Sequence, residues 1–464
     1  MESQTFKAGA GRCDITPPLG TLINGDFISH YARSIHDPLY AKALVLQKGK
    51  TLLCFLVVDI CCMHKDFLDQ VKKEINAQTG IRPDHILISS THTHAAGSVE
   101  SLLLGAADLP YRQKLPPLLV QAVVQAIERL RPAKIAFGAI DAPEHVVCRR
   151  YFMKPGYKAY NPVTGALDQV KTNPAGHEDQ IERRESPVDP QLSYLAVRGL
   201  DDQWISLLAN YSMHYVGDWE NGVITADYFG VFDRELSVKL AADSDFVGIM
   251  TNGTSGDANI MDFLQLDRYP KGHFEKSALI GSDLAEKVVR SLEEVAWQED
   301  PALDAGYREI PIKLRKPSVT ELREAESILA DTHYETLKLK DSHTGNEDGF
   351  KRIYAREQLL LQEFPERISF PVQLLRIGNG SVGGLGGEIF SETGLWLKQA
   401  MREIAAGPYF TICLANDSAG YIPPPGEFAL GGYETWRNRS SCLEQEAERI
   451  IREQLVALAR MPDE

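Results

Sequence analysis

The sequence predicts an α/β fold consisting of one large mixed-sheet domain with surrounding helices. Apolar runs of strand length alternate with amphipathic runs at helical spacing along most of the 464 residues. Near the N-terminus, two β-rich runs within residues 43–60 precede a helical pattern over 64–78 and a short apolar strand over 85–90. Strand, helix and strand in this order are typical of a βαβ unit.

The remaining elements follow from the same two periodicities. A helix over 118–130 ends ahead of Pro132, because a residue before proline is disfavoured in helical conformation. The other expected strands are 134–140, 191–199, 204–214, 368–378 and 381–388, and the other expected helices are 228–242, 391–405 and 442–461.

Two segments depart from this alternation. Residues 154–190 are rich in Pro, Gly, Asn and charge without a sustained period, which is typical of a long excursion or a lid. Residues 317–364 are strongly charged and mostly helical with a break at 341–349, which predicts a helical hairpin inserted on the outside. Because there is no internal repeat, low-complexity tract or clear linker, we expect residues 1–464 to form a single domain.

Composition and charge exclude several classes of protein. The 49 basic and 64 acidic residues give a net charge of -15, and no basic cluster offsets it locally, so nucleic acid is not an expected partner. No apolar run approaches the roughly 20 residues that span a bilayer, so no integral membrane segment is expected. The N-terminus shows no signal-peptide pattern and the seven cysteines are scattered, which favours reduced thiols and a cytoplasmic location. The sequence makes no prediction of the oligomeric state.

Three histidines lie where apolar runs end. His92 and His94 form the pair in THTH, and a spacing of two places both side chains on one face of an extended chain. His214 ends the run NYSMH. Imidazole is a common zinc ligand, and ligands gather at strand ends of α/β folds. Taken singly, however, the pair also fits a solvated surface pair, and His214 fits a histidine bonded to backbone.

The acidic and tyrosine candidates are equally open when each is considered alone. Asp227 precedes an expected helix and fits a helix N-cap as well as a functional carboxylate. Asp257 lies in the tight turn NGTSGDAN, which presents either this side chain or backbone N–H groups, or is purely structural. Glu388 follows a glycine-rich strand end, so it is either a first-turn carboxylate or a ligand aimed into a cleft. Tyr421 and Tyr433 share one long loop and also fit ordinary packing tyrosines.

Eight segments occur in order along the chain: GRCDITPPLG, HDPLYAKALVL, THTHAAGS, CRRYFMKPG, NYSMHYVG, NGTSGDAN, LGGEIFSETG and NDSAGYIPPPGEFALGGYE. Together they resemble the N-terminal catalytic domain of the neutral/alkaline (non-lysosomal) ceramidase family, and the chain is similar to its shorter bacterial ceramidase-like members. The resemblance implies the family's catalytic-domain fold over residues 1–464.

The resemblance also implies roles for particular residues. It implies one zinc ion (Zn2+) held by His92, His214, Glu388 and Tyr421. Two histidines and a glutamate form a known catalytic zinc set that leaves room for water. The resemblance further implies catalytic roles for His94, Arg149 and Tyr433. Asp227 and Asp257 remain candidates for supporting positions around the metal.

Two departures from the family bear on the substrate. Where the family usually carries a serine shortly after the Gly-Asp of its turn, this chain has Ala258 and Asn259, which excludes a serine mechanism through that position. The chain ends soon after the GGYE segment, so the C-terminal immunoglobulin-like domain of full-length ceramidases is not expected. Membrane-bound ceramide is therefore not the expected substrate.

The expected function is that of a zinc-dependent hydrolase, cleaving an amide (N-acyl) bond of a small-molecule substrate by metal-activated water. One alternative is a zinc hydrolase acting on an ester, a lactone or a carbohydrate, since activated water attacks many electrophiles. The other alternative is a non-catalytic ligand-binding protein, because a fold does not by itself determine a function.

Overall fold

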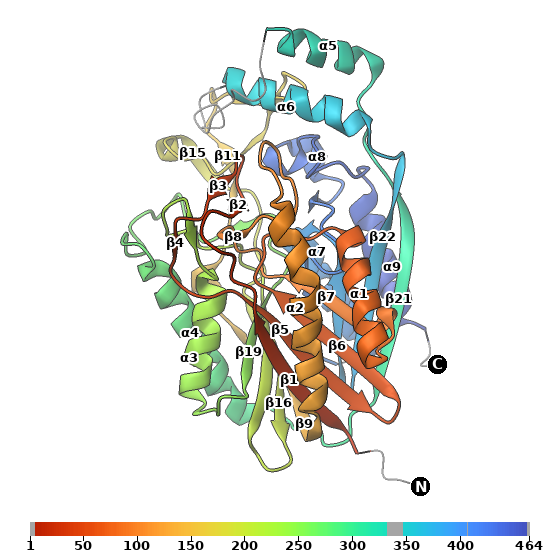
Figure 1. Cartoon of the computed structure of the whole chain (residues 1–464). Helices are drawn as coiled ribbons and strands as arrows, with labels where there is room; N and C mark the ends of the chain where they lie inside the picture. The colour runs from red at the N-terminus through yellow and green to blue at the C-terminus, as the bar shows by residue number, and fades with distance from the viewer. Residues whose placement is uncertain (1–4, 332–346, 406, 462–464) are drawn as a thin grey trace.

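The computed structural model describes residues 5–331, 347–405 and 407–461 (Figure 1). Its largest element is an eight-stranded mixed sheet in the order β19-β17-β16-β9-β1-β5-β6-β7. The strands are β1 (Lys7–Asp14), β5 (Tyr40–Lys48), β6 (Thr51–Val58), β7 (Ile86–Ser90), β9 (Arg131–Asp141), β16 (Gln191–Gly199), β17 (Trp204–Tyr211) and β19 (Val247–Asn252). This mixed sheet with surrounding helices confirms the predicted α/β class.

The eight-stranded sheet consists of two four-stranded halves. β1 and β9 pair over two residues only, Lys7 with Pro132 and Ala8 with Arg131. A separate four-stranded sheet has the order β21-β22-β23-β25, with β21 (Leu303–Lys313), β22 (Arg367–Ile377), β23 (Gly380–Leu385) and β25 (Tyr409–Ile412). One buried cluster joins Phe55 from the first half, Ile249 from the second and Phe410 from the separate sheet. Three groups of four strands therefore share one apolar core.

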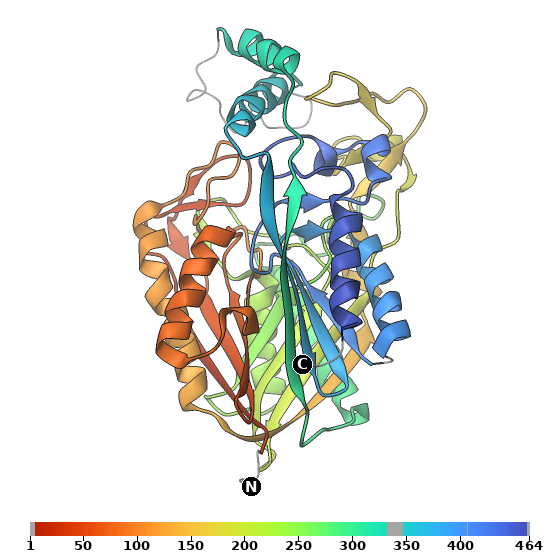
Figure 2. The same cartoon turned by 90° about the vertical axis from the view of Figure 1, so that its right-hand side faces the viewer.

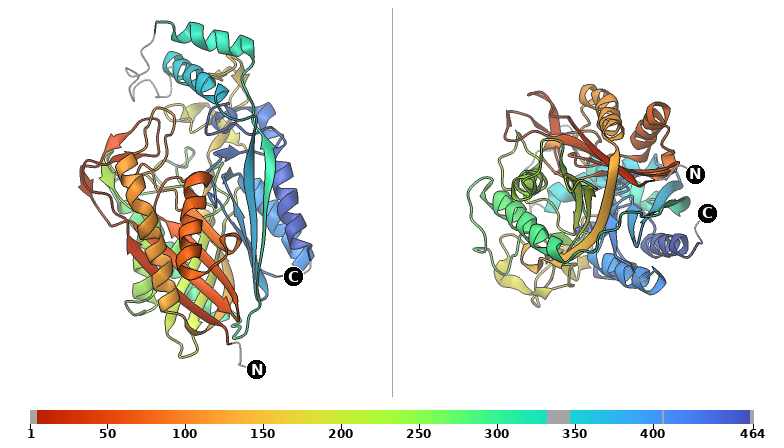
Figure 3. Two further views of the ribbon diagram at one scale, coloured as in Figure 1. Left: turned by 45° about the vertical axis from the view of Figure 1, so that its right-hand side comes forward. Right: turned by 90° about the horizontal axis from the view of Figure 1, so that it is seen from below.

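Each group is covered on its outer side by two helices. α1 (Lys65–Thr79) and α2 (Leu109–Glu128) pack on the β1-β5-β6-β7 half, and α3 (Asp227–Lys239) and α4 (Glu275–Ser291) pack on the other half. α7 (Ser391–Ala405) and α9 (Ala447–Ala459) pack on the separate sheet. The view from below in Figure 3 shows the three helix pairs around the sheets, and Figure 2 shows the first and third pairs on opposite sides.

Three βαβ units build this arrangement. They are β6-α1-β7, β17-α3-β19 and β23-α7-β25, and the two strands of each unit are parallel neighbours. The first was predicted from the sequence. Because ligands in α/β folds gather beyond the carboxyl ends of such strands, three sets of loops become available for one site.

The expected helix at 118–130 is longer than predicted. It begins at Leu109, where the Asp108 side chain caps it by accepting from the Tyr111 N–H at 3.0 Å. Pro116 and Pro117 lie inside the helix. Proline in a helix interior removes a backbone hydrogen bond, which is why the pattern alone indicated a later start.

The two irregular segments lie beyond the strand ends. Within 154–190, β14 (Val170–Thr172) and β15 (Ile181–Arg184) flank β11 (Arg150–Met153) in a small antiparallel sheet. Within 317–364, α5 (Val319–Leu329) and α6 (Glu347–Gln362) pack together through Ala325, Leu329 and Ala355. Figure 1 shows both helices at the end of the molecule away from the two termini. Most of the break expected at 341–349 lies outside the described residues.

The short elements near the site complete the fold. They are β2 (Leu22–Asn24), β3 (His30–Tyr31), β4 (Ser34–Ile35), β8 (Ala96–Gly97), β10 (Val147–Cys148), β12 (Ala159–Tyr160), β13 (Leu167–Asp168), β18 (Val223–Ile224), β20 (Ala258–Asn259), β24 (Glu388–Ile389), β26 (Tyr421–Ile422) and α8 (Glu427–Leu430). Across the described ranges, no helix is both long and apolar enough to cross a membrane.

Candidate metal centre

Three of the predicted ligands follow strands of the three different βαβ units. His92 comes after β7, His214 after β17 and Glu388 after β23. All three side chains are buried. Their potential ligand atoms all lie within 4.8 Å of one another, so the structure brings together residues that are far apart in the sequence.

The imidazole rings of His92 and His214 face each other through their Nε2 atoms. His92 Nε2 lies 3.2 Å from His214 Nε2. On the far side of each ring, Nδ1 faces a backbone carbonyl, that of Cys61 at 2.7 Å for His92 and that of Ser255 at 3.2 Å for His214. A carbonyl can only accept, so each Nδ1 carries the proton. Both Nε2 lone pairs are therefore free and directed into the site.

The Glu388 carboxylate completes a triangle with these nitrogens. Its Oε2 lies 3.5 Å from His92 Nε2 and 3.8 Å from His214 Nε2. This oxygen is buried and has no hydrogen-bond partner within the described part of the chain. Burying such an atom without a partner is costly. Ligands about 2.0–2.1 Å from a tetrahedral zinc ion lie about 3.3 Å apart, so the three observed spacings fit a shared ion.

Tyr421 lies beside this triangle on a neighbouring strand. Glu388 and Tyr421 are register partners in the parallel pair β24–β26. Burial raises the pKa of Glu388, while the charges of His92 and Arg149 and a hydrogen bond with Tyr421 oppose that increase. The Tyr421 side chain thus lies next to the carboxylate of the predicted ligand Glu388.

His94 borders the same three groups. Its Nε2 lies 3.1 Å from His92 Nε2, and its ring stacks on Tyr215 with centroids 3.7 Å apart. Its Nδ1 is buried and has no hydrogen-bond partner in the described ranges. Burial, followed by the charges of His92 and Arg149, lowers the pKa of His94 well below its ordinary value, so the neutral ring is favoured.

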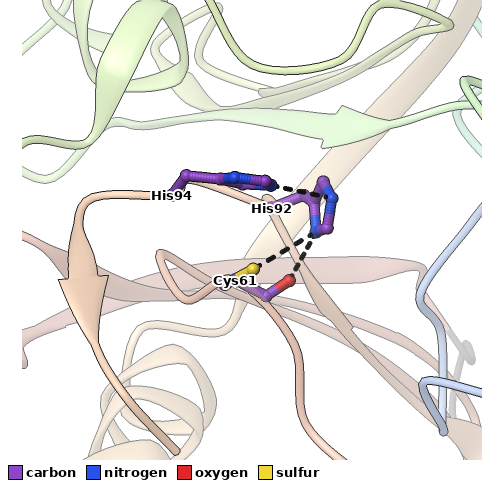
Figure 4. Close-up of side chains that lie close together, drawn as sticks. All are labelled: Cys61, His92 and His94. Carbon is purple, nitrogen blue, oxygen red and sulfur yellow. Dashed lines mark hydrogen bonds between the residues drawn. The ribbon is translucent and has the colours of Figure 1, made fainter. Parts of the chain in front are cut away.

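A second grouping of possible ligands is Cys61, His92 and His94 (Figure 4). The Cys61 Sγ lies 3.7 Å from His92 Nδ1, whereas His94 meets His92 at Nε2. Figure 4 shows these contacts on two different nitrogens of the ring. One ion cannot bind both nitrogens of the same imidazole, and Nδ1 already donates to the Cys61 carbonyl. The group of His92, His214 and Glu388 is therefore the better metal site.

Arg149 and Tyr433 lie next to the Tyr421 ring. The Arg149 guanidinium carbon is 5.1 Å from the centre of the Tyr421 ring, and the Tyr433 ring is 5.5 Å from the same ring between centroids. Arg149 donates from Nη2 to the Gly256 carbonyl at 2.8 Å. The structure thus gathers all seven residues to which the resemblance assigned metal or catalytic roles around one cavity.

The matches with known proteins agree with this geometry. The family described as "Neutral/alkaline non-lysosomal ceramidase, N-terminal" matches residues 6–261, which is more than half of the chain. The chain belongs to this ceramidase family. The matched residues include His92, His94, Arg149 and His214, whereas Glu388, Tyr421 and Tyr433 lie beyond them.

Individual ceramidases show how far the likeness extends. Neutral ceramidases of Drosophila pseudoobscura pseudoobscura and Drosophila melanogaster are each 25% identical over 276 residues, covering 56% of this chain and 37% of the relative. The ceramidase-family chain thus spans well under half the length of these curated relatives. A solved neutral ceramidase from Pseudomonas aeruginosa superposes with a TM-score of 0.72 at 17% identity, covering 99% of this chain and 74% of that one. The structure titled "Ceramidase complexed with C2" gives 0.70 at 16% identity, covering 100% and 76%. These two structures establish the shared fold.

The turn NGTSGDAN holds several parts of this ceramidase-family site together by its backbone. Its Ser255 carbonyl accepts from His214, and its Gly256 carbonyl accepts from Arg149. The Gly256 N–H donates to the Ile389 carbonyl at 2.8 Å, one residue after Glu388. The sequence alone did not decide whether this turn is structural or functional. In the structure its backbone links His214, Arg149 and the strand that carries Glu388.

The two aspartates proposed as supporting residues contact backbone rather than the metal triangle. Asp257 Oδ1 accepts from the Ser391 N–H at 2.7 Å, at the start of α7. Asp227 Oδ2 accepts from the Val216 N–H at 2.7 Å and fixes the loop after His214. Burial raises the pKa of Asp227 to about 7 and that of Asp257 to about 6, and backbone hydrogen bonds oppose both increases.

Ala258 lies away from the cavity. Its side chain is fully buried in a cluster with Tyr211 and Phe232, and β20 pairs it with Cys148. A hydroxyl at this position would point into that core, which agrees with the exclusion of a serine mechanism.

Sequence reasoning missed three contributors to the site. Cys61 acts through its carbonyl on the His92 ring, Tyr215 stacks on His94, and Glu434 bonds to Arg149. Tyr215 directly follows His214 and Glu434 directly follows Tyr433, so adjacency to a candidate was the available signal. No side-chain pattern marks Cys61, because any residue supplies a carbonyl.

The cavity above the site has a volume of about 620 Å³ and combines an aromatic wall with a polar rim. Phe27, Phe350 and Trp436 extend the line of rings that starts at Tyr421 and Tyr433, with edge or tilted contacts of 5.5–6.3 Å between centroids. Phe350 belongs to α6, so the helical insertion expected on the outside also forms part of the cavity wall.

Proposed function

We propose that the protein is a zinc-dependent hydrolase that cleaves an amide (N-acyl) bond. The observation that carries this proposal is the buried triangle of His92 Nε2, His214 Nε2 and Glu388 Oε2, with spacings of 3.2, 3.5 and 3.8 Å. Membership of the ceramidase family, whose relatives are named for amide cleavage, supports the choice of bond.

His92, His214 and Glu388 would hold one zinc ion, with Tyr421 as the fourth ligand. Two imidazoles and a carboxylate form a donor set that zinc uses in catalytic sites. When bound, zinc supplies a water of lowered pKa and polarises a substrate carbonyl. The carbonyls of Cys61 and Ser255 fix both histidines in the tautomer that such binding requires.

His94 would move the proton. Its Nε2 lies at the edge of the triangle, where it can accept a proton from the attacking water and give it to the leaving nitrogen. The stack on Tyr215 restrains the orientation of the His94 ring. Arg149 and Tyr433 would donate hydrogen bonds to the developing oxyanion, an interaction worth about 3 kcal/mol for one donor.

The cavity supports an amide whose acyl group is apolar. The wall of Phe27, Phe350 and Trp436 lines the same cavity as the metal triangle and offers apolar surface to one substituent of the scissile carbonyl. Asp26, Glu100 and Arg112 also line the cavity and offer polar groups to the other substituent. We expect a small-molecule amide and not membrane-bound ceramide as the preferred substrate.

The first experiment measures metal and turnover in matched histidine variants. We expect the purified protein to carry one zinc ion, His92→Ala to lose it, and His94→Ala to keep it while losing turnover. His85→Ala is the control, because His85 precedes β7 whereas the site lies beyond the end of that strand. Retained zinc with full turnover in both site variants would exclude the assignment.

The second experiment compares scissile bonds. A panel of N-acyl amides from acetyl to long-chain acyl groups, with matched esters, a lactone, a glycoside and ceramide in detergent, is assayed with the zinc-loaded protein. Fastest cleavage of an amide supports the proposal, and fastest cleavage of an ester, lactone or glycoside replaces it. A protein that binds zinc and cleaves none of these would instead fit a ligand-binding role.

A further inference from the structure

Arg149 lies beside the metal triangle, and two of its three guanidinium nitrogens donate hydrogen bonds to other residues. Nε donates to Glu434 Oε1 at 2.7 Å, and Nη2 donates to the Gly256 carbonyl at 2.8 Å. The guanidinium also shares a hydrogen bond with Tyr421. Two bonds at different nitrogens fix the plane of a guanidinium, so the direction in which its remaining edge points is set by Glu434 and Gly256.

Glu434 is itself held on both carboxylate oxygens. Its Oε2 accepts from Arg150 Nη1 at 2.9 Å and from the Thr172 hydroxyl at 2.8 Å. The side chain is fully buried. Its position is thus determined by donors from two separate segments of the chain and not by solvent.

The excursion at 154–190 supports the loop that carries Glu434. Asp168 Oδ2 accepts from the Gly432 N–H at 2.9 Å and from the Trp436 indole at 2.6 Å, on either side of Glu434. The Gln169 N–H donates to the Leu430 carbonyl at 2.8 Å. These bonds attach residues 168 and 169 of the excursion to the loop of residues 430–436.

Arg149 and Arg150 differ in their acidic partners. Arg150 pairs with Glu434 and also with Glu427, whose Oε2 lies 2.6 Å from its Nη2. For Arg149, the ion pair found among the described residues is that with Glu434. Loss of either carboxylate removes one buried pair from Arg150, but only loss of Glu434 releases Arg149.

We infer that Glu434 is a positioning residue that orients Arg149 toward Tyr421 and the substrate carbonyl. This inference rests on the proposed function, because the carbonyl is the group that Arg149 would stabilise. Glu434 does not touch the metal triangle, and the excursion that binds it through Thr172 acts as a support of the site. A side chain that acts only through Arg149 has no effect once Arg149 is removed.

The test compares Glu434→Gln with Glu427→Gln. Both variants keep side-chain size and remove one carboxylate partner of Arg150, so a role that acts through Arg150 alone predicts a loss of kcat in both. We expect Glu434→Gln to lower kcat about 10- to 100-fold, with zinc content and KM within about 2-fold of wild type. We expect Glu427→Gln to lower kcat by less than about 3-fold, although its melting temperature also falls.

A double variant shows whether the effect passes through Arg149. We expect Arg149→Met with Glu434→Gln to have the same kcat as Arg149→Met alone. A further 10-fold loss in the double variant, or equal losses of kcat in Glu434→Gln and Glu427→Gln, would overturn the inference. Should Glu434→Gln fail to fold, Thr172→Val removes one bond to the same carboxylate and is expected to lower kcat by a smaller factor.

Crystal structures of the zinc-loaded variants give a readout that does not depend on turnover. We expect the Arg149 guanidinium to rotate away from Tyr421 in Glu434→Gln and to stay in place in Glu427→Gln. An unmoved Arg149 in Glu434→Gln overturns the inference even if amide cleavage is confirmed. If the wild type cleaves no amide, the proposed function fails, and these structures still decide whether Glu434 orients Arg149.

Discussion

Replacement of Gly256 by alanine tests whether the NGTSGDAN turn sets the position of the proposed metal ligands. A Cβ at this residue would lie 2.5 Å from the Glu388 carbonyl oxygen, 2.9 Å from the Glu388 carbonyl carbon and 3.0 Å from the Ile389 oxygen. All three neighbours are backbone atoms, so no side-chain rotation relieves the contact. The φ of Gly256 is not positive, so alanine is permitted by the local backbone and the effect is steric.

The distances give the size of the effect. An ordinary van der Waals contact begins at 3.4 Å, so the Glu388 backbone must move by about 0.9 Å. Because Glu388 is the first residue of β24, we expect that displacement to move its carboxylate relative to both histidines. A misplacement of about 1 Å costs on the order of 100-fold in rate, and disturbing the support of a metal ligand costs about 10- to 100-fold in metal affinity. Overpacking should also cost about 1–3 kcal/mol of unfolding free energy.

The assay measures zinc affinity by competition with a chromophoric chelator, together with kcat/KM and the melting temperature. Gly426→Ala is the matched control, because a Cβ there meets no atom within 4 Å and its φ is negative. We expect weakened zinc binding and turnover in Gly256→Ala and wild-type values in Gly426→Ala. A folded Gly256→Ala protein with unchanged zinc affinity and turnover would refute the reasoning.

Two further predictions concern His94 and a buried lysine. A Cβ at Gly25 would lie 2.4 Å from His94 Cγ and 2.7 Å from its Cα, so Gly25→Ala should lower turnover at least about 10-fold while zinc content, measured by mass spectrometry, stays constant. Burial lowers the pKa of Lys72 to about 7 from its ordinary 10.5. The unfolded state therefore binds more protons between these values, and wild-type stability rises with pH across that window. Lys72→Met lacks this dependence, and urea unfolding should find it more stable than wild type by a few kcal/mol at pH 6 and by less at pH 9; equal slopes with pH in the two proteins would contradict the assignment.

Local patterns predicted the elements well but not their grouping. The alternation of strands and helices comes from residues close in sequence, and the first βαβ unit, β6-α1-β7, was identified this way. No local signal shows that β9 pairs with β16 along its length but with β1 over only two residues. The separation into three four-stranded groups around one core depends on contacts such as that of Phe137 with Phe410, whose ring centroids lie 6.3 Å apart although the two residues are far apart in the sequence.

The same limit applies to the candidate site, because local sequence shows single residues but not which of them lie together. The strand ends visible in the sequence made His92, His214 and Glu388 candidates, and the family resemblance grouped them as ligands. In the structure, the meeting of three βαβ units brings them together. Tyr421 carries no local mark, since its relation to Glu388 arises from the pairing of β24 with β26. Glu434 is one of 64 acidic residues in the sequence. It differs from most of them because it is completely buried between two arginines, and this burial cannot be seen in the sequence.

Several of the bonds that support the candidate site come from backbone carbonyls and not from side chains. The tautomers of His92 and His214 are fixed by the carbonyls of Cys61 and Ser255, and Arg149 is held in part by the carbonyl of Gly256. A carbonyl is supplied by every residue, so the side chains at 61 and 255 can change without altering what the histidines present. The backbone, in contrast, must keep its course past each strand end, because this course places the carbonyls. We therefore expect the site to be most sensitive to changes of the proposed ligands, of Gly256, where two backbones touch, and of the strands that place these carbonyls.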